Sequence, residues 1–485
     1  MKKWLSECQC RHKGMSQLPT RILDVGANHF GRSIKLRIRT KSPYPENADY
    51  VALSYCWGGS QPIVATIASL PKLEAGISIE ELPQTIRDAV EVTRKLGFRF
   101  LWVDSLCIIQ DSESDKAFEI SQMGSVYTNA FVTLAASSAH SVTEGFLRSS
   151  VSLDYSTVPI SIASRFRASR TGKLSICKKE IKKGKLPLDQ RGWSFQEFVL
   201  SPRIIQFWNG DLVWTCNEDK MRRVQGLAFD YDVPIRYGNT ELNNLRLEIH
   251  ANSMLGDVDR CTNWTRIVCD YTARKLSDKN DRLNAIAGVA TRLETKWGDE
   301  YLYGLWKSKM IRQLTWVIAA NYGLEQRPLE RSMVAPSWSW ASVNSRVDYS
   351  RFGLTQDAIS LGMDLSSNYP HGEHSRRLRL SARLLQKLKL VADTRYTYYF
   401  HTDVESDDLI ADEAIELLYM GQDSPIRDEY NYKHVREEYI GLLVTRIEED
   451  CFRRIGWFQM LEEDYDTYQG KEKWEAITRQ QLVLI

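Results

Sequence analysis

The sequence predicts an α/β fold in which a parallel sheet is flanked by helices, with a mainly helical middle region and a β-rich C-terminal region after it. Two observations predict this architecture. Short apolar segments alternate with amphipathic segments of helical period between residues 50 and 136, which is typical of a parallel sheet covered by helices. Aromatic and β-branched residues are frequent again after residue 331, and these residue types favour strands.

Three strands and two flanking helices make up the predicted α/β core. They are, in chain order, a strand at 50–55, a helix at 84–97, a strand at 98–103, a helix at 115–129 and a strand at 131–136. The strands are near-continuous apolar runs, because a parallel sheet is buried on both faces. The helices carry apolar residues at helical spacing, and Gly97 is a typical stop for the first of them. A short helix at 191–202 and a hairpin across Asn209-Gly210 follow later.

The chain has 485 residues, a length that predicts about two to four domains. Changes in residue pattern divide it into four regions. These are an N-terminal segment and linker at 1–45, the α/β domain at 46–215, a helical region at 216–330 and a β-rich region at 331–485.

The composition excludes several classes of function. Lys and Arg number 64 against 62 Asp and Glu, so the net charge is only +2, and we expect no nucleic-acid partner. No apolar run is long enough to span a bilayer and no signal peptide is visible, so we expect no membrane partner. Nine cysteines in a chain of this length suit reduced thiols and a cytoplasmic location. The Cys8-x-Cys10-x-His12 spacing has no second ligand cluster, so we expect no metal.

Candidate binding residues follow the first two strands. Ser54, Tyr55, Trp57 and Gly58 come at the end of the first strand, and Asp104 ends the second. Ligands of open parallel sheets bind beyond the carboxyl ends of the strands, so we expect these residues around one mouth. Structural alternatives stay open: Asp104 would cap the following loop, and the Ser54 and Tyr55 side chains would bond backbone at a strand end.

Three motifs resemble the heterokaryon-incompatibility (HET) domain of fungi. The first is YVALSYCWG at 50–58. The second is LPQTIRDA at 82–89, which runs on to LWVDSLCIIQD at 101–111, and the third is RGWSFQE at 191–197. The resemblance covers about residues 18–216 in register. It implies a role in allorecognition and programmed cell death.

The order of elements also resembles a TIR domain, which implies a flavodoxin-like sheet. TIR enzymes that cleave NAD keep a Trp four residues before the catalytic Glu, and Trp193 and Glu197 have that spacing. The resemblance implies NAD or a related nucleotide as substrate and no bound cofactor. Arg191 would be a partner for the phosphate or, alternatively, a surface salt-bridge residue. This chain departs from the pattern by an insertion of roughly 50 residues between Ser138 and Trp193, far longer than an ordinary connection.

Two roles for Glu197 stay open. As a catalytic residue it would stabilise the oxocarbenium-like transition state of nicotinamide–ribose cleavage. As a structural residue it would complete a capping box with Ser194. At the level of function, the alternative to an NAD glycohydrolase is a non-enzymatic interaction module in allorecognition. For either function we expect self-association or an incompatibility partner protein.

Overall fold

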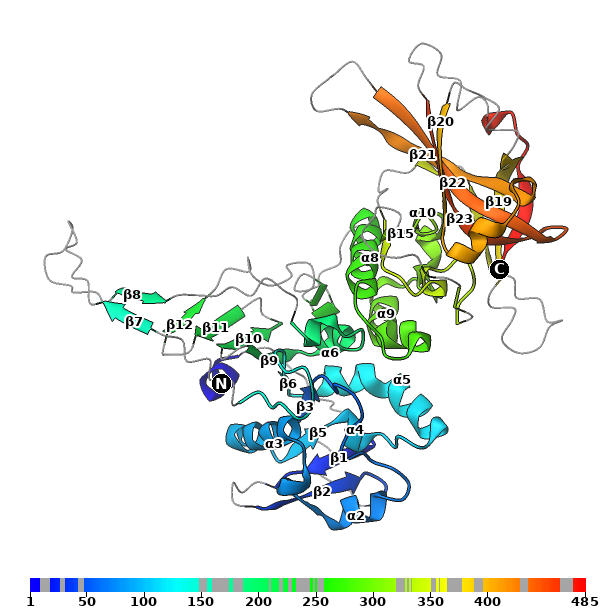
Figure 1. Ribbon diagram of the computed structural model, residues 1–485. Coiled ribbons are helices and arrows are strands. Elements are labelled where there is room, and N and C mark those ends of the chain that lie inside the picture. The colour runs from blue at the N-terminus through cyan, green and yellow to red at the C-terminus, as the bar shows by residue number, and fades with distance from the viewer. Residues whose placement is uncertain are drawn as a thin grey trace, which may run out of the picture. The chain divides into compact units, whose positions relative to one another are not determined.

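The computed structural model divides into two compact units, Met1–Ala251 and Asn252–Ile485 (Figure 1). Each unit is described by itself. The structure describes residues 1–8, 18–26, 31–41, 48–147, 155–158, 174–177, 186–208, 211–217, 221–225, 229–232, 245–246, 249–250, 257–319, 328, 331–332, 334–349, 355–356, 358–363, 377–387, 396–427, 435–462 and 474–485.

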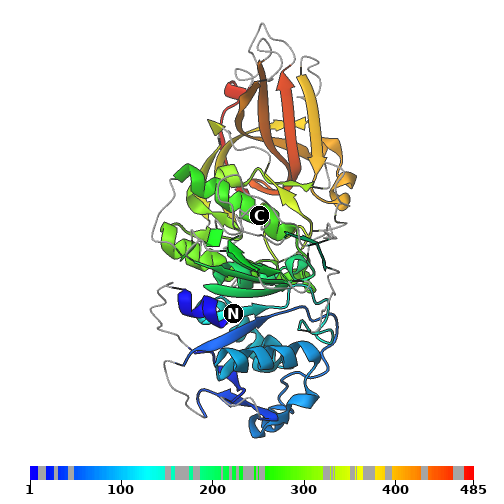
Figure 2. The same ribbon diagram turned by 90° about the vertical axis from the view of Figure 1, so that its left-hand side faces the viewer.

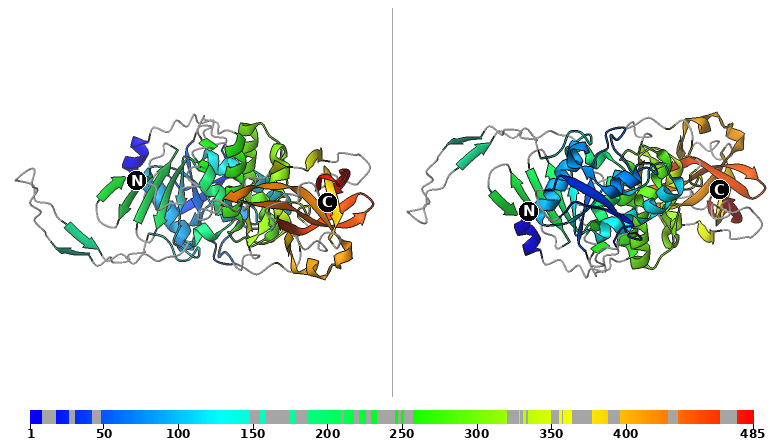
Figure 3. Two further views of the ribbon diagram at one scale, coloured as in Figure 1. Left: turned by 90° about the horizontal axis from the view of Figure 1, so that it is seen from above. Right: turned by 90° about the horizontal axis from the view of Figure 1, so that it is seen from below.

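The first unit is built on a ten-stranded mixed sheet with the order β12-β11-β10-β9-β6-β3-β5-β1-β2-β4. Its centre is parallel and consists of β9 (Arg203–Trp208), β6 (Val132–Ala135), β3 (Tyr50–Ser54) and β5 (Phe100–Trp102). The three strands predicted between residues 50 and 136 are thus confirmed to within two residues at each end. The strands turn progressively from one edge to the other (Figure 3), as is usual for β-sheets.

Helices cover both faces of this sheet. The two predicted helices are α3 (Gln84–Leu96) and α5 (Glu113–Asn129), and Figure 1 shows them on opposite sides of β3 and β5. Gly97 ends α3 in the left-handed conformation with φ of 97°, as the sequence predicts. The shorter helices of the unit are α1 (Lys2–Glu7), α2 (Leu70–Ala75), α4 (Asp104–Cys107) and α6 (Ser194–Leu200).

Antiparallel strands extend the sheet past β5, and here the structure differs from the expected N-terminal segment and linker at 1–45. Within that segment, β1 (Arg21–Asp24) and β2 (Ser33–Ile38) are strands of the central sheet, and β4 (Ile77–Ser78) forms the edge. All four residues of β1 are buried. The charged residues Arg21 and Asp24 make this strand look polar in the sequence. They can be buried because each pairs with a distant residue: Arg21 bonds Asp115 at 2.5 Å, and Asp24 bonds Arg99 at 2.8 Å.

The other edge continues into the region expected to be helical from residue 216. The predicted hairpin is confirmed as β9 with β10 (Asp211–Cys216), and β11 (Met221–Gln225) and β12 (Phe229–Asp232) extend it antiparallel. A separate antiparallel pair is formed by β7 (Tyr155–Val158) and β8 (Leu174–Cys177).

The second unit joins a helical part to a β-sheet, which confirms the β-rich C-terminal region. Its helices are α8 (Asp257–Thr272), α9 (Asn284–Trp297) and α10 (Met310–Gln313). Two small strand pairs lie beside them: β13 (Tyr301–Leu302) with β14 (Leu305–Trp306), and β15 (Val317–Ile318) with β16 (Val347–Asp348). The eight-stranded sheet (Figure 2) contains β17 (Thr355–Gln356), β18 (Ile359–Met363), β19 (Leu378–Gln386), β20 (Tyr396–Thr402), β21 (Ile415–Arg427), β22 (Val435–Glu448), β23 (Cys451–Glu462) and β24 (Gln480–Leu484).

A buried guanidinium connects this sheet to the helical part of the second unit. Arg454 on β23 is fully buried and pairs with Asp403 at 2.9 Å. It donates to the carbonyls of Leu314 and Trp316 at 2.6 Å each, and its guanidinium lies 3.5 Å from the centre of the Trp316 ring. Every contact of this charge is therefore with protein rather than water.

None of the helices in the described ranges is both long enough and apolar enough to cross a membrane.

Candidate functional site

The candidate site is centred on Glu197, at the carboxyl edge of the parallel strands. Glu197 lies in α6 and is only 2% exposed. Its carboxylate accepts a hydrogen bond from the Ser54 hydroxyl at the end of β3. Because β3 is the central strand and α6 comes more than a hundred residues later, this bond joins the first and third motifs of the sequence.

The turn that precedes α6 is fixed by Ser194. Its hydroxyl donates to the carbonyls of Leu188 at 2.6 Å and Arg191 at 2.8 Å. Trp193 rather than Ser194 occupies the N-cap position of α6, so the Ser194 cap that the sequence left open as one role is not formed. The Glu197 carboxylate is instead bonded to the Ser54 hydroxyl on β3.

The other end of α6 is anchored as firmly. Ser201 donates from its hydroxyl to the Glu197 carbonyl at 2.5 Å, and that hydroxyl also bonds the Thr133 hydroxyl on β6 at 2.6 Å. The Arg246 guanidinium donates to the Ser201 carbonyl at 2.7 Å and lies over the Phe198 ring. Glu197 thus lies on a short helix that is held at both ends. Its first residue bonds the preceding turn, and the residue after its last turn bonds β6 and Arg246.

Arg191 provides a positive charge beside Glu197. One of its terminal nitrogens donates to the Tyr55 carbonyl. Burial by itself lowers the pKa of a guanidinium, but the carboxylates of Glu197 and Asp104 outweigh this effect and raise the pKa of Arg191. The side chain is therefore the shared cationic neighbour of two acidic groups, rather than the surface salt-bridge residue that its sequence context also allowed.

Asp104 begins α4 directly after β5 and bonds both to the loop after β3 and to its own chain. It accepts hydrogen bonds from the Trp57 indole at 2.8 Å and from the Ser105 amide at 2.6 Å. Burial raises the pKa of Asp104, although Arg191 and these two donors act in the opposite direction. Tyr55 bonds the Ser105 hydroxyl at 3.0 Å, and burial raises its pKa well above the ordinary value.

Gly58 has a local structural role in the loop after β3. Its φ is +72°, and a Cβ atom there would lie 2.3 Å from the Ser141 Cβ and 2.8 Å from the His140 carbonyl oxygen. The 140–141 segment of the chain therefore approaches this position so closely that it leaves no room for a side chain.

We expect Gly58→Ala to lower the free energy of unfolding of the first unit by about 1–3 kcal/mol more than Gly59→Ala. Both glycines have positive φ, but a Cβ at Gly59 meets nothing within 4 Å, so the difference isolates the steric overlap with Ser141. Urea denaturation of the two variants measures it. Equal midpoints would show that the 140–141 segment moves aside without cost.

The structure brings together most of the residues that the sequence proposes. Hydrogen bonds or electrostatic interactions link five of them to one another: Ser54, Tyr55, Asp104, Arg191 and Glu197. Trp57 joins them through its bond to Asp104, and Trp193 stands one helical turn before Glu197, whose amide donates to the Trp193 carbonyl at 3.4 Å.

Sequence reasoning missed three hydroxyl groups of this cluster, those of Ser105, Thr133 and Ser201. Ser105 follows directly after Asp104 and could have been found by its position. Thr133 and Ser201 carry no such signal, because their bond joins a strand and a helix end that are 68 residues apart.

In the part of the chain that the structure describes, no group of three or more His, Cys, Asp or Glu side chains gathers in a way that could hold a metal ion. Of the Cys8-x-Cys10-x-His12 motif only Cys8 falls within this part. Its sulfur accepts a hydrogen bond from Arg203 at 3.4 Å.

The fold and the cluster define an α/β protein that places a carboxylate, a guanidinium and several hydroxyl groups at the carboxyl edge of a parallel sheet. Residues 50–197 match the family described as heterokaryon incompatibility protein (HET), so this part of the chain is similar to that family. The match begins at the first residue of β3 and ends at Glu197. Neither the curated proteins nor the solved structures gave a significant match.

Proposed function

We propose that this protein acts in heterokaryon incompatibility by cleaving the nicotinamide–ribose bond of NAD, with programmed cell death as the outcome. The observation that carries the proposal is the position of the Glu197 carboxylate. It lies at the end of the central strand, bonded to Ser54 and close to the Arg191 charge. Nucleotides bind at this edge of open parallel sheets, so the carboxylate, which is 2% exposed, would meet the ribose once substrate binding uncovers it.

The strand order supports the resemblance to TIR domains. Numbered as they occur in the chain, the four parallel strands β5-β3-β6-β9 have the order 2-1-3-4. This is the beginning of the flavodoxin-like order, in which ligands bind beside the first strand. Ser54 and Glu197 both lie beside that strand here.

The chemistry requires a fixed negative charge. Cleavage of the nicotinamide–ribose bond passes through an oxocarbenium-like state, and an anionic carboxylate stabilises the positive charge that develops on the ribose. Ser54 and the anchored helix α6 hold Glu197 in one orientation, so little reorganisation is needed during the reaction. Arg191 would bind the substrate pyrophosphate, and Trp57 and Trp193 would form apolar walls that exclude water.

A non-enzymatic interaction module is the second candidate function. It is favoured by the same hydrogen bond from Ser54, because a buried carboxylate that accepts a bond from its own fold also serves stability. In that case Glu197 is structural and the domain acts only by binding an incompatibility partner.

Nicotinamide release separates these two functions. The purified chain is incubated with NAD, and the products are resolved by liquid chromatography. The proposed function requires nicotinamide to appear as NAD disappears, whereas a pure interaction module leaves NAD intact.

An activity of this kind needs control, and we propose that self-association completes the site. The specific activity should then rise with protein concentration over a dilution series. A specific activity that is the same at all concentrations would show that the single chain is already competent.

We expect the cleavage to weaken on acidification at a pH above the ordinary titration range of an aspartate. Burial raises the pKa of Asp104, so its carboxyl gains a proton earlier as the pH falls. The neutral form no longer balances the charge of Arg191. In a profile of kcat/KM against pH, Asp104→Asn should remove this acid limb, whereas Asp111→Asn should retain it. An unchanged limb in Asp104→Asn would assign it to another group.

A further inference from the structure

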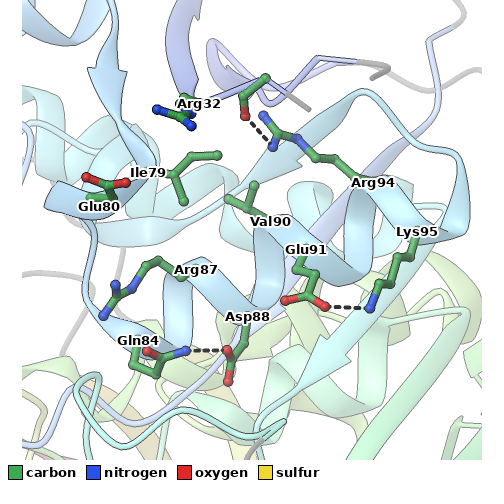
Figure 4. Close-up of a pocket in the computed structure, with 11 residues that line it drawn as sticks. Arg32, Ile79, Glu80, Gln84, Arg87, Asp88, Val90, Glu91, Arg94 and Lys95 are labelled. Carbon is green, nitrogen blue, oxygen red and sulfur yellow. Dashed lines mark hydrogen bonds and ion pairs between the residues drawn. The ribbon is translucent and has the colours of Figure 1, made fainter. Parts of the chain in front are cut away.

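A second candidate site lies in the first unit, on the surface of α3. A pocket of about 660 Å³ is bounded by α3, by the 310 turn Ile79–Glu81 and by the residues just before β2 (Figure 4). Pockets of this size hold small organic ligands. None of the residues of the Glu197 cluster lines it.

Most charged side chains that line the pocket already form hydrogen bonds or ion pairs within the chain. Arg94 donates to the carbonyls of Val25 and Gly31 at 2.7 Å each, and Lys95 pairs with Glu91 at 2.5 Å. Asp88 accepts hydrogen bonds from the Gln84 side chain and from the backbone amides of residues 146 and 147. These groups shape the pocket but offer little to a ligand.

Two guanidinium groups are different. In the described part of the chain, the guanidinium groups of Arg32 and Arg87 make no hydrogen bond or ion pair, and no dashed line reaches either group in Figure 4. The Nε atom of Arg87 is buried without an acceptor. Buried donors are nearly always bonded in folded proteins. Several other arginine Nε atoms of the described residues also lack an acceptor, but that of Arg87 is distinguished by lining a pocket in which an acceptor from outside the chain would fit.

The remaining surface of the pocket tells which kind of molecule would fit. Ile79 and Val90 contribute apolar side chains between the charged ones. Glu80 is the one acidic group of the lining whose carboxylate has no partner in the described part of the chain, and it is exposed. Its single negative charge balances only one of the two positive charges of Arg32 and Arg87.

We propose that this pocket binds a small organic anion, whose phosphate or carboxylate group is held by Arg87 and Arg32 and whose apolar part packs on Ile79 and Val90. Guanidinium groups bind both kinds of oxyanion with two parallel hydrogen bonds. Filling the pocket in this way gives the buried Nε atom of Arg87 its missing acceptor. The site is independent of the Glu197 cluster and of NAD cleavage.

Titration calorimetry on the full chain tests the site with three probes of the same size: phenyl phosphate, benzoate and neutral benzyl alcohol. We expect one or both anions to bind and the alcohol not to bind, and the stronger anion identifies the preferred oxyanion. Arg87→Ala should weaken the binding at least about tenfold. Arg32→Ala should weaken it as well, and because Arg32 is exposed this variant should leave folding unchanged.

Lys95→Ala is the matched control, since it removes one positive charge from the same lining. Its ammonium is already paired with Glu91, so binding should change less than about twofold. Glu80→Gln should strengthen binding, because it removes the competing carboxylate. The proposal is overturned if no anion binds, if Lys95→Ala weakens binding as much as Arg87→Ala, or if both arginine variants bind like the native chain. Glu197→Gln should bind the probes normally, which keeps this test separate from that of NAD cleavage.

Discussion

Glutamine in place of Glu197 is expected to lower NAD cleavage by about 10²–10³-fold, the scale found when one preorganised electrostatic contact to a transition state is removed. The amide oxygen of glutamine can still accept the hydrogen bond from Ser54, so the fold should lose little stability. What the substitution removes is the negative charge that stabilises the developing cation on the ribose. Initial rates of nicotinamide release by the native and variant chains measure the effect.

Glu119→Gln is the control for this experiment. Glu119 is also a glutamate with 2% exposure in the same unit, but its carboxylate pairs with Arg21 at 3.1 Å, away from the candidate site. This variant should melt at a lower temperature and yet cleave NAD normally while folded. If instead Glu197→Gln keeps full activity and only melts earlier, Glu197 is a structural residue.

The second large effect is expected in the second unit. Arg454→Met should lower its free energy of unfolding by about 3–5 kcal/mol, because removing one partner of a buried ion pair is strongly destabilising and Asp403 is left with Arg331 as its cation. The change takes a partner from Asp403 and leaves the carbonyls of Leu314 and Trp316 without their donor. Chemical denaturation followed by tryptophan fluorescence reports it, since Trp316 lies against the guanidinium.

Arg446→Met is the matched control for Arg454→Met. Arg446 pairs with Glu416 at 3.0 Å, but its side chain is 45% exposed. Surface pairs of this kind contribute at most about 1 kcal/mol. Similar unfolding midpoints for the two variants would show that the second unit does not depend on the buried contact.

The sequence predicts the centre of the first sheet well because the parallel strands are continuous apolar runs. It does not reveal β1, since Arg21 and Asp24 make that strand look polar. Their partners, Asp115 and Arg99, lie 94 and 75 residues further along the chain. Neutralisation at such distances belongs to the tertiary structure, so local pattern cannot disclose it.

The candidate site, like the first sheet, could be predicted in part from local sequence pattern and depends in part on tertiary structure. Its residues could be selected because they end strands or stand in the third motif. The direction of the Glu197 side chain could not be predicted from the sequence, since Ser194-x-x-Glu197 has the local pattern of a capping box. In the structure Trp193 rather than Ser194 is the N-cap of α6, and the Glu197 carboxylate bonds Ser54, which lies 143 residues earlier in the chain.

The most direct test of the central claim is the amount of nicotinamide formed when the full chain, at the highest concentration at which it stays soluble, is incubated with NAD. We expect nicotinamide to accumulate in step with the loss of NAD for the native chain and to be nearly absent for Glu197→Gln. A folded native chain that leaves NAD intact under these conditions would contradict the assignment of NAD cleavage to this protein.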